Sequence, residues 1–428
     1  MSDGSARRIV IVGGGQAAVQ ACQSLRSFGF GGDITLISEE PDLPYQRPPL
    51  SKACLKGEMA TDRLQLKPEK WFRDNHVDLK RETRVTQISR GPRTVHLNNG
   101  EVVSYDALIL ATGARARRLS IPGEGLGGVL YVRTREDVDR LRAALGGIKK
   151  VVLIGGGYIG LETAASCRSL GHDVTVLEAA KRVLARVTHP ELSGFFQAQH
   201  TARGVDIRTD TKVSEILEKD GMACGVRTTD GTVFEADIVI IGAGADPNTD
   251  LATAARLQCE RGILVGGDAR TSDPRIFAIG DCASRPLELC ARQVQLESVH
   301  NAIEQAKQAA SVLCGMPRPK YECPWFWSDQ FDLKLQIAGL SADFDDVVVK
   351  TDGDKSFTVF YFQRGDLIAV DAVNAASNFL FTKRALEIGA RVRIATIADE
   401  KFDFRSALLN LRPAITPRDI LDLNHIDH

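Results

Sequence analysis

Closely spaced pairs of cysteines are missing from this sequence. Nine cysteines are present, an odd number, and none stands in a C-x-x-C pair or at another short spacing. Metal sites and redox-active disulfides usually depend on such pairs. The sequence therefore predicts no metal site, and it indicates reduced, mostly buried thiols.

Long apolar runs and an excess of charge of one sign are missing as well. Lys and Arg total 54 against 55 Asp and Glu, a formal net charge of −1, whereas a general nucleic-acid binder carries a basic excess. No apolar run approaches the roughly 18 residues that span a bilayer. Residues 1–5 lead into a strand-like segment without an apolar signal peptide. We therefore expect a cytoplasmic protein that binds neither nucleic acid nor membrane.

An internal repeat is what the sequence does contain. Each copy consists of a β-branched strand, a glycine-rich turn, a helix-like stretch, a second strand and an acidic residue. In the first copy these parts are Arg8–Val12, Gly13–Ala18, Val19–Ser27, Ile34–Ile37 and Glu39, and in the second copy they are Val151–Ile154, Gly155–Gly160, Leu161–Leu170, Val174–Leu177 and Glu178. Two copies in matching contexts favour a shared function over two incidental glycine turns.

Each part of the repeat serves the binding of a dinucleotide. The first glycine allows a tight turn, the second lets the backbone approach a pyrophosphate, and a small third residue lets the helix pack closely on the strand. The pyrophosphate then lies at the positive N-terminus of the helix, where backbone N–H groups are free to donate. The carboxylate of the acidic residue accepts hydrogen bonds from the ribose hydroxyls. The repeat therefore predicts two dinucleotide-binding sites.

The order of the remaining segments predicts three domains. Small residues follow two further buried strands, Ala107–Leu110 and Asp237–Ile241, and an acid follows a third, Ile276–Ile279. From about residue 320 the pattern changes to short antiparallel strands and a helix near Ala376–Ile388. The predicted fold class is α/β, with two Rossmann-like dinucleotide-binding domains at residues 1–113 with 244–320 and at residues 114–243, followed by a C-terminal α+β domain at residues 321–428.

A series of motifs gives the sequence a resemblance to a known family. The motifs are Leu43–Lys52 (LPYQRPPLSK), Ile154–Glu162 (IGGGYIGLE), Thr271–Pro274 together with Ile279–Cys282, Glu297–Val299, and Pro324–Gln330 (PWFWSDQ). In this order they resemble the flavoprotein reductases of the glutathione-reductase fold, and most of all the NADH-dependent ferredoxin reductases of bacterial oxygenase systems. The resemblance extends from Ile9 to about Val373.

The resemblance implies that the first site holds FAD. Glu39 would accept the hydroxyls of the adenosine ribose, Asp281 would bind the ribityl chain, and the backbone near Val299 would reach the pyrimidine edge of the flavin ring. The full set of implied FAD contacts is Gly13, Gly15, Ala17, Ala18, Glu39, Lys52, Val85, Ala111, Arg133, Asp281, Val299 and Trp327.

Lys52 and Glu162 match the pair of charged residues that the family uses in catalysis. Lys52 would lie near the reactive face of the flavin, where reduction adds negative charge that a fixed cation stabilises. Glu162 would keep Lys52 charged and oriented in a partly dry site. The resemblance also implies that Trp325 and Trp327 line the flavin where a partner protein docks.

The resemblance assigns the second site to NADH. Glu178 lies 23 residues after Gly155, close to the expected spacing of about 20. Its carboxylate would bind the 2′-hydroxyl of NADH and repel the 2′-phosphate of NADPH, although Lys181 and Arg182 follow closely and could weaken that preference. The implied NADH contacts are Gly155, Gly157, Tyr158, Ile159, Gly160, Glu178 and Gly242.

The implied activity is electron transfer from NADH through FAD to a [2Fe–2S] ferredoxin that supplies a haem mono-oxygenase or a related oxygenase. NADH delivers two electrons as a hydride, an iron–sulfur cluster accepts one at a time, and a flavin can do both. Because the net charge gives no general attraction, an acidic ferredoxin would dock on a local basic patch. Arg285, Arg292 and Lys307 are the candidate cations, and we expect a monomer or a weak dimer.

Other functions of this fold stay open as alternatives. A disulfide reductase is not among them, because it needs a cysteine pair that the sequence lacks. An NADH oxidase or peroxidase would use one redox cysteine facing the flavin, and Cys54 is the candidate. A redox-gated binding protein resembling apoptosis-inducing factor is the other alternative, against which the lack of a targeting segment and of a basic nucleic-acid patch argues.

Overall fold

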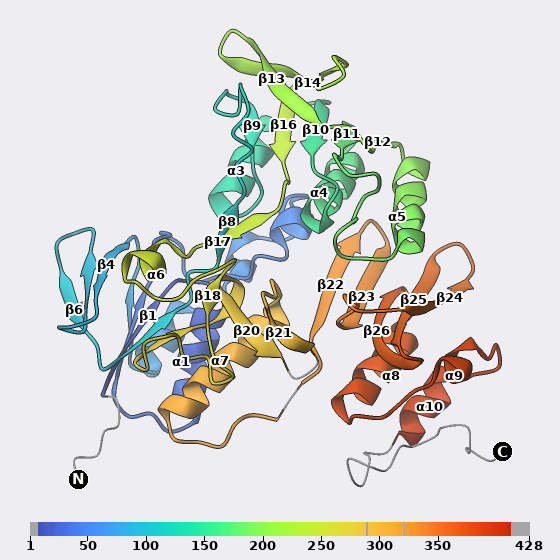
Figure 1. Cartoon of the computed structure of the whole chain (residues 1–428). Helices are drawn as coiled ribbons and strands as arrows, with labels where there is room; N and C mark the ends of the chain where they lie inside the picture. The colour runs from blue at the N-terminus through green and yellow to red at the C-terminus, as the bar shows by residue number, and fades with distance from the viewer. Residues whose placement is uncertain (1–6, 288–289, 321, 412–428) are drawn as a thin grey trace. The chain divides into compact units, whose positions relative to one another are not determined.

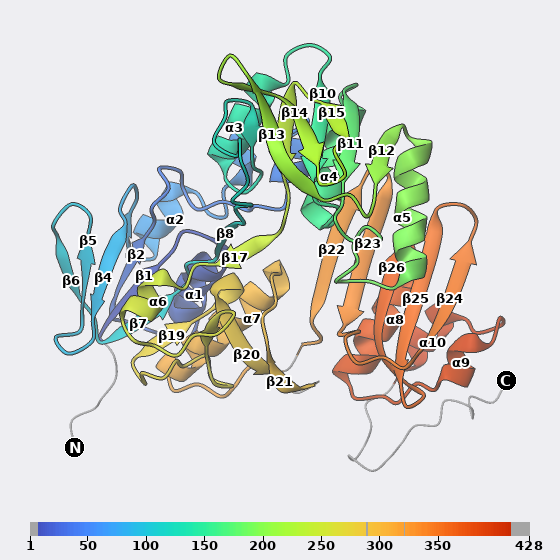
Figure 2. The ribbon, with the colours of Figure 1, turned by 45° about the horizontal axis from the view of Figure 1, so that its top comes forward.

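The computed structural model describes residues 7–287, 290–320 and 322–411, and within them the chain forms two compact units. The first unit contains residues 7–47, 60–115 and 245–320, and the second contains residues 48–59, 116–244 and 322–411. The path of the chain through both units can be followed in Figures 1 and 2. No helix within the described ranges is long and apolar enough to cross a membrane.

A parallel five-stranded sheet forms the centre of the first unit. Its strand order is β19-β7-β1-β2-β3, with β1 at Arg8–Val12, β2 at Asp33–Ile37, β3 at Val77–Lys80, β7 at Ala107–Leu110 and β19 at Ile276–Ala278. Alternate residues of a strand point to opposite faces, and β1 shows this clearly. Ile9 and Ile11 pack against α1 (Gln16–Ser27) and α7 (Val299–Leu313), whereas Val10 and Val12 face the core on the other side.

A second parallel sheet repeats this arrangement in the second unit, with strand order β12-β11-β10-β16-β9. Its strands are β9 (Val129–Leu130), β10 (Lys150–Ile154), β11 (Asp173–Leu177), β12 (Val205–Arg208) and β16 (Ile238–Ile241). The helices are α3 (Arg135–Ala144), α4 (Tyr158–Ser169) and α5 (Pro190–Ala202), and an antiparallel sheet adds β13 (Val213–Lys219), β14 (Met222–Thr228) and β15 (Val233–Glu235).

The C-terminal part of the second unit is an antiparallel sheet of order β22-β23-β26-β25-β24 (Figure 2). Its elements are β22 (Trp325–Gln330), β23 (Leu333–Gly339), β24 (Asp346–Asp352), β25 (Ser356–Gln363), β26 (Asp366–Val373), α8 (Ala376–Glu387), α9 (Ile394–Ala398) and α10 (Phe404–Asn410). One face buries Phe360 and Phe362 against the C-terminal helices. The other face buries Tyr361 together with Leu161 of α4 and Phe196 of α5.

Smaller elements complete the described chain. They are η1 (Leu50–Cys54), η2 (Thr61–Leu64), α2 (Glu69–Asp74), β4 (Val85–Ser89), β5 (Thr94–Leu97), β6 (Val102–Ser104), β8 (Ala114–Ala116), β17 (Ala245–Pro247), α6 (Asp250–Ala254), β18 (Ile263–Leu264), η3 (Gly280–Cys282), β20 (Ala283–Leu287) and β21 (Cys290–Val294). The antiparallel sheet β4-β5-β6 packs its apolar residues, among them Val85 and Leu97, into the core on the β1 face that carries Val10.

The predicted fold class is confirmed, because two parallel Rossmann-like sheets precede an antiparallel C-terminal sheet with its helices. The predicted domain bounds stay a prediction, and the two compact units do not follow them at every point. Residues 48–59 were expected in the first domain, but they belong to the second unit, where the hydroxyl of Ser166 on α4 donates to the Ser51 carbonyl at 2.6 Å. That the second unit comprises two domains, predicted at residues 114–243 and 321–428, stays a prediction.

Candidate dinucleotide and charge-pair sites

The glycine turn after β1 is shaped by two different demands. Gly13 has φ +125°, and a Cβ there would lie 2.1 Å from the Ala111 carbonyl oxygen, so only glycine fits. Gly15 has no heavy atom within 4 Å of the place a Cβ would take, yet it begins α1 as the N-cap without a side-chain capping bond. The turn thus leaves open space beside unpaired helix N–H groups, which is the cradle that a pyrophosphate needs.

The glycine turn after β10 has the same construction. Gly155 has φ +113°, and a Cβ there would lie 2.5 Å from the Gly242 carbonyl oxygen. Around Gly157, the N-cap of α4, the space for a Cβ is again open. A Cβ on Gly160 would lie 2.1 Å from the Gly155 carbonyl oxygen, so the helix packs directly on the turn. Two cradles of one design therefore lie in one chain.

The acids that follow the two second strands differ in how they are held. Glu178 accepts hydrogen bonds from the backbone N–H of Gly156 at 2.6 Å and of Ala180 at 2.7 Å, which fixes its carboxylate beside the turn. Glu39 is exposed, and its carboxylate lies 4.0 Å from the Arg84 guanidinium. Both acids stand at the carboxyl edge of their sheet, as the ribose contacts of a dinucleotide do.

The structure brings several of the implied FAD contacts to one edge of the first sheet. Ala111 directly follows β7 and lies beside Gly13, and a Cβ on Gly280 would lie 3.1 Å from the Cβ of Ala17. Asp281 follows Gly280 in the turn after β19. Of the other implied contacts, Ala18 is buried in α1, Val85 is buried on β4, and Val299 is the first residue of α7.

Arg47 is a residue of this region that the sequence reasoning left without a role. Its guanidinium donates to the Glu40 carboxylate at 2.5 Å, the Tyr45 hydroxyl donates to the same carboxylate, and Asp281 interacts with Arg47 electrostatically. Arg47 therefore places a positive charge near the carboxyl edge of the first sheet. Its place in the LPYQRPPLSK motif was the signal that could have found it.

Lys52 and Glu162 meet in the second unit. The Lys52 ammonium lies 2.9 Å from Glu162 Oε2, which also accepts from the Ser51 hydroxyl at 2.5 Å. The other oxygen, Oε1, accepts from the Ser328 hydroxyl at 2.7 Å. Burial raises the pKa of Glu162, while Lys52 and the two hydroxyls act in the opposite direction. The predicted pair is thus assembled, and the structure adds two serines that the sequence reasoning did not single out.

The remaining implied contacts of the second unit lie near this pair or before α3. Tyr158 packs its partly buried ring on Phe326, with ring centroids 4.9 Å apart, while its neighbour Ile159 is 47% exposed. Trp327 lies on β22 with its ring 5.4 Å from that of Trp325. Arg133 precedes the N-cap of α3. That Lys52, Arg133 and Trp327 contact FAD stays a prediction.

Cys54 is unsuited to redox chemistry. It is fully buried, and burial raises the pKa of its thiol. A reactive cysteine needs an accessible thiolate, which an electropositive environment and a lowered pKa provide. The NADH oxidase or peroxidase alternative is therefore not favoured.

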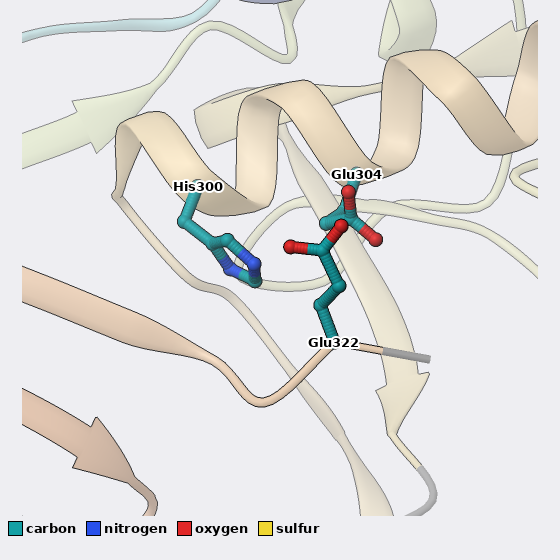
Figure 3. A group of neighbouring side chains, drawn as sticks. All are labelled: His300, Glu304 and Glu322. Carbon is teal, nitrogen blue, oxygen red and sulfur yellow. The ribbon is translucent and has the colours of Figure 1, made fainter. Parts of the chain in front are cut away.

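The candidate docking cations lie on three elements of the first unit. Arg285 is on β20, Arg292 is on β21, and Lys307 is on α7. Lys307 forms an ion pair of 2.8 Å with Glu304, three residues before it. Figure 3 shows Glu304 and His300 projecting from neighbouring turns of α7. Lys307 therefore presents its charge together with a neighbouring acid, and the docking patch stays a prediction.

Comparisons with known proteins cover nearly the whole chain. Residues 7–306 match the pyridine nucleotide-disulphide oxidoreductase family, and residues 325–408 match the reductase C-terminal family. The rhodocoxin reductase of Rhodococcus erythropolis is 42% identical over 401 residues, with 94% of each chain covered. The putidaredoxin reductase of Pseudomonas putida is 39% identical over 406 residues, with 94% of this chain and 96% of that one covered.

Solved structures agree with these relatives. The covalent complex of putidaredoxin reductase with putidaredoxin gives a TM-score of 0.92 at 38% identity, covering 94% of this chain and 98% of that chain. A ferredoxin reductase from Rhodopseudomonas palustris gives a TM-score of 0.91 at 41% identity, covering 94% of this chain and all of the other.

Proposed function

Because the chain belongs to the pyridine nucleotide-disulphide oxidoreductase family, we propose that it is an NADH-dependent flavoprotein that reduces a ferredoxin. The observation that carries this proposal is the pair of matching glycine cradles, Gly13–Gly15 and Gly155–Gly157. Relatives named as reductases of small redox proteins span the same length of chain, which supports a ferredoxin as the electron acceptor.

FAD fits the cradle of the first unit. The open space at Gly15 and the free N–H groups of α1 accept a pyrophosphate, and the exposed Glu39 is available to the ribose hydroxyls. Asp281 and the nearby Arg47 supply polar groups at the same edge of the sheet. FAD, when bound, supplies the conversion of a two-electron hydride donor to single-electron transfer.

NADH fits the cradle of the second unit better than NADPH does. The Glu178 carboxylate is held in place by backbone N–H groups, so its charge would oppose a 2′-phosphate. Arg182, which could have weakened that preference, donates instead to the Thr188 carbonyl at 2.9 Å and to the Ser193 hydroxyl at 2.6 Å. Its guanidinium is therefore engaged in hydrogen bonds within the second unit.

Lys52, held in its ion pair with Glu162, places a fixed positive charge in a partly desolvated environment. Lys52 is 16% exposed and Glu162 2% exposed at the side chain, so little water screens the pair. We infer that Lys52 stabilises the negative charge that reduction adds to the flavin. Glu162 would hold that ammonium in place.

The finer properties of the partner are proposals as well. We propose an acidic [2Fe–2S] ferredoxin that docks through Arg285, Arg292 and Lys307 and then serves an oxygenase, with the reductase acting as a cytoplasmic monomer or weak dimer. The solved complex of a similar reductase with putidaredoxin supports a ferredoxin-type partner.

The proposed function is tested by NADH-driven reduction of a panel of purified ferredoxins, followed at the visible absorbance of the cluster. The purified protein should be yellow, and the flavin released on denaturation should chromatograph as FAD. Release of FMN, or NADH oxidation that no ferredoxin in the panel accelerates, would contradict the proposal.

A further inference from the structure

Four buried polar side chains form a row of hydrogen bonds that ends on Glu162. Ser328 Oγ lies 2.7 Å from Glu162 Oε1, Gln330 Nε2 lies 3.2 Å from Ser328 Oγ, and His200 Nε2 lies 2.8 Å from Gln330 Oε1. Ser328, Gln330 and His200 have no solvent exposure, and Glu162 has 2%. Water therefore cannot complete a missing bond, and each group depends on its neighbours.

The hydrogen-bonding capacity of these groups fixes the direction of the row. Burial lowers the pKa of His200 to about 4, so its imidazole is neutral near pH 7 and carries one N–H. Gln330 Oε1 can only accept, so that N–H is on His200 Nε2. Gln330 Nε2 can only donate, so the proton of the Ser328 hydroxyl is directed at the Glu162 carboxylate. Every bond in the row thus donates toward Oε1 of Glu162, and this oxygen carries no proton.

A proton on Oε1 of Glu162, the oxygen that faces Ser328, would require the row to reverse. This proton would go to Ser328, the Ser328 hydroxyl would donate to the Gln330 carbonyl, and the turned amide would donate to His200 Nε2. His200 would then carry its N–H on Nδ1, which has no hydrogen-bond partner among the described residues. Buried N–H groups without an acceptor are rare because they are costly. His200 therefore disfavours the reversed row.

We propose that Ser328 and Gln330, supported by His200, are positioning residues that keep Glu162 ionised and turned toward Lys52. They act through Glu162 and do not themselves touch a substrate. The proposal deepens the proposed function. It rests on that function in one respect only, namely that the reaction uses the positive charge of Lys52. It also gives a role to the last residues of the PWFWSDQ motif.

The groups that face Glu162 come from each element packed on it. Lys52 and the Ser51 hydroxyl approach from the 48–59 segment, and Tyr158 of α4 interacts with Glu162 electrostatically. At the far end of the row, Arg203 acts on His200. Burial raises the pKa of Glu162, so the donors in this environment decide whether it stays charged near neutral pH.

The protonation of Glu162 can be followed by infrared difference titration of the protein as purified. Subtracting the spectrum of Glu162→Gln isolates the C=O stretch that Glu162 shows only when it is protonated. Ser328→Ala removes one hydrogen bond to the charged carboxylate and should raise the pKa of Glu162 by about one to two units. Gln330→Leu leaves the Ser328 hydroxyl in place but frees its direction, so it should produce a smaller shift of the same sign.

Two variants serve as controls for this titration. Ser328→Thr keeps the hydroxyl and should titrate like the wild type. Thr382→Val removes another buried hydroxyl of the C-terminal part, one without a hydrogen-bond partner in the described ranges, and should leave Glu162 unchanged.

An unaltered Glu162 titration in Ser328→Ala overturns the positioning role, and Gln330→Leu decides the matter in the same way if Ser328→Ala does not fold. The titration needs neither NADH nor ferredoxin. A wild-type protein that reduces no ferredoxin would therefore contradict the proposed function without touching this result.

Discussion

At the scale of single residues, we propose that Glu178 carries the choice between the two nicotinamide cofactors. Its carboxylate is held by the N–H groups of Gly156 and Ala180, so it would meet the ribose of the cofactor without having to be ordered first. Glu178→Ala should raise KM for NADH and improve the use of NADPH, because both the hydrogen bond and the repulsion vanish. We expect a roughly tenfold to hundredfold change in the NADH/NADPH ratio of kcat/KM, from the loss of about 1.5–3 kcal/mol.

Arg182 provides the matched comparison on the same loop. Its guanidinium donates to Thr188, Ser193 and Ala185, so Arg182→Ala should lower the melting temperature and leave the cofactor ratio unchanged. Steady-state kinetics with both cofactors, together with a thermal melt, separate the two effects. If the NADH/NADPH ratio of kcat/KM changed in Arg182→Ala but not in Glu178→Ala, Glu178 would not be the residue that distinguishes the two cofactors.

Lys307 tests the docking patch. Lys307→Glu should slow ferredoxin reduction and leave the NADH-to-ferricyanide activity intact, because the small dye needs no docking surface. The wild-type ferredoxin rate should also fall as salt rises. Since Lys307 is paired with Glu304, the variant also sets two acids three residues apart, so helix stability should be checked by a thermal melt.

The same change of charge at Lys219, an exposed residue of β13, is the control for Lys307. Lys219→Glu should leave both activities unchanged. Equal losses of ferredoxin and ferricyanide activity in Lys307→Glu would mean that the residue supports the fold or the flavin site, and the docking proposal would fail.

At the scale of elements, two glycines of each turn have different roles: the first allows the tight turn, and the second leaves open space at the start of the helix. Gly15 begins α1 with φ −94° and open space where a Cβ would be, so Gly15→Ala should fold. Its methyl group would occupy the space that the pyrophosphate needs, and FAD should bind roughly tenfold to hundredfold more weakly through lost charge-assisted bonds. Fluorescence titration of the apoprotein with FAD measures this.

Gly13→Ala is the contrasting variant in the same turn. Its φ of +125° and the 2.1 Å approach to the Ala111 carbonyl leave no room for a methyl group, so the apoprotein itself should melt at a lower temperature. If Gly15→Ala were as unstable as Gly13→Ala, or bound FAD as the wild type does, the division of roles would be wrong.

At the scale of the whole molecule, a buried carboxyl group makes the stability of the second unit depend on pH. Asp371 of β26 accepts from the hydroxyls of Tyr361 and Thr188, each at 2.5 Å, and burial raises its pKa from 3.8 to about 6. Because the folded protein holds this proton more tightly than the unfolded chain, the stabilisation is complete below about pH 4 and is lost as the pH rises through 6.

Asp371→Asn removes this titration. Between about pH 4 and pH 7 the free energy of unfolding of the wild type should fall relative to the variant by up to about 3 kcal/mol. Urea unfolding at several pH values measures the difference. A difference that stays constant over this range would show that Asp371 is ionised at its ordinary pKa.

Asp366 on the same strand is the control with the opposite sign. Burial acts to raise its pKa, but Arg391 and Arg393 outweigh burial and hold the pKa of Asp366 below its usual value. Asp366→Asn should therefore remove a stabilisation that the wild type loses as the pH falls. The two variants together distinguish burial of the carboxyl group from ion pairing.

The sequence by itself determined the parts of this protein that depend on neighbouring residues. The strand, glycine turn and helix of each repeat appear where the pattern predicted them, although α1 begins at Gln16 rather than at Val19. The glycine positions could be predicted because a tight turn and a close helix restrict φ and exclude a Cβ locally. Lys52 and Glu162 were expected as a pair only because their motifs resemble those of a known family.

Only the tertiary structure decided which distant residues complete the site. Ser51 and Ser328 meet Glu162 across 111 and 166 residues of sequence, and Arg182 turns into its own loop. Nothing in local periodicity indicates such contacts, because a buried carboxylate takes its donors from whichever elements the packing brings to it. The residues that set the charge state of Glu162 therefore follow from the fold and not from the motif.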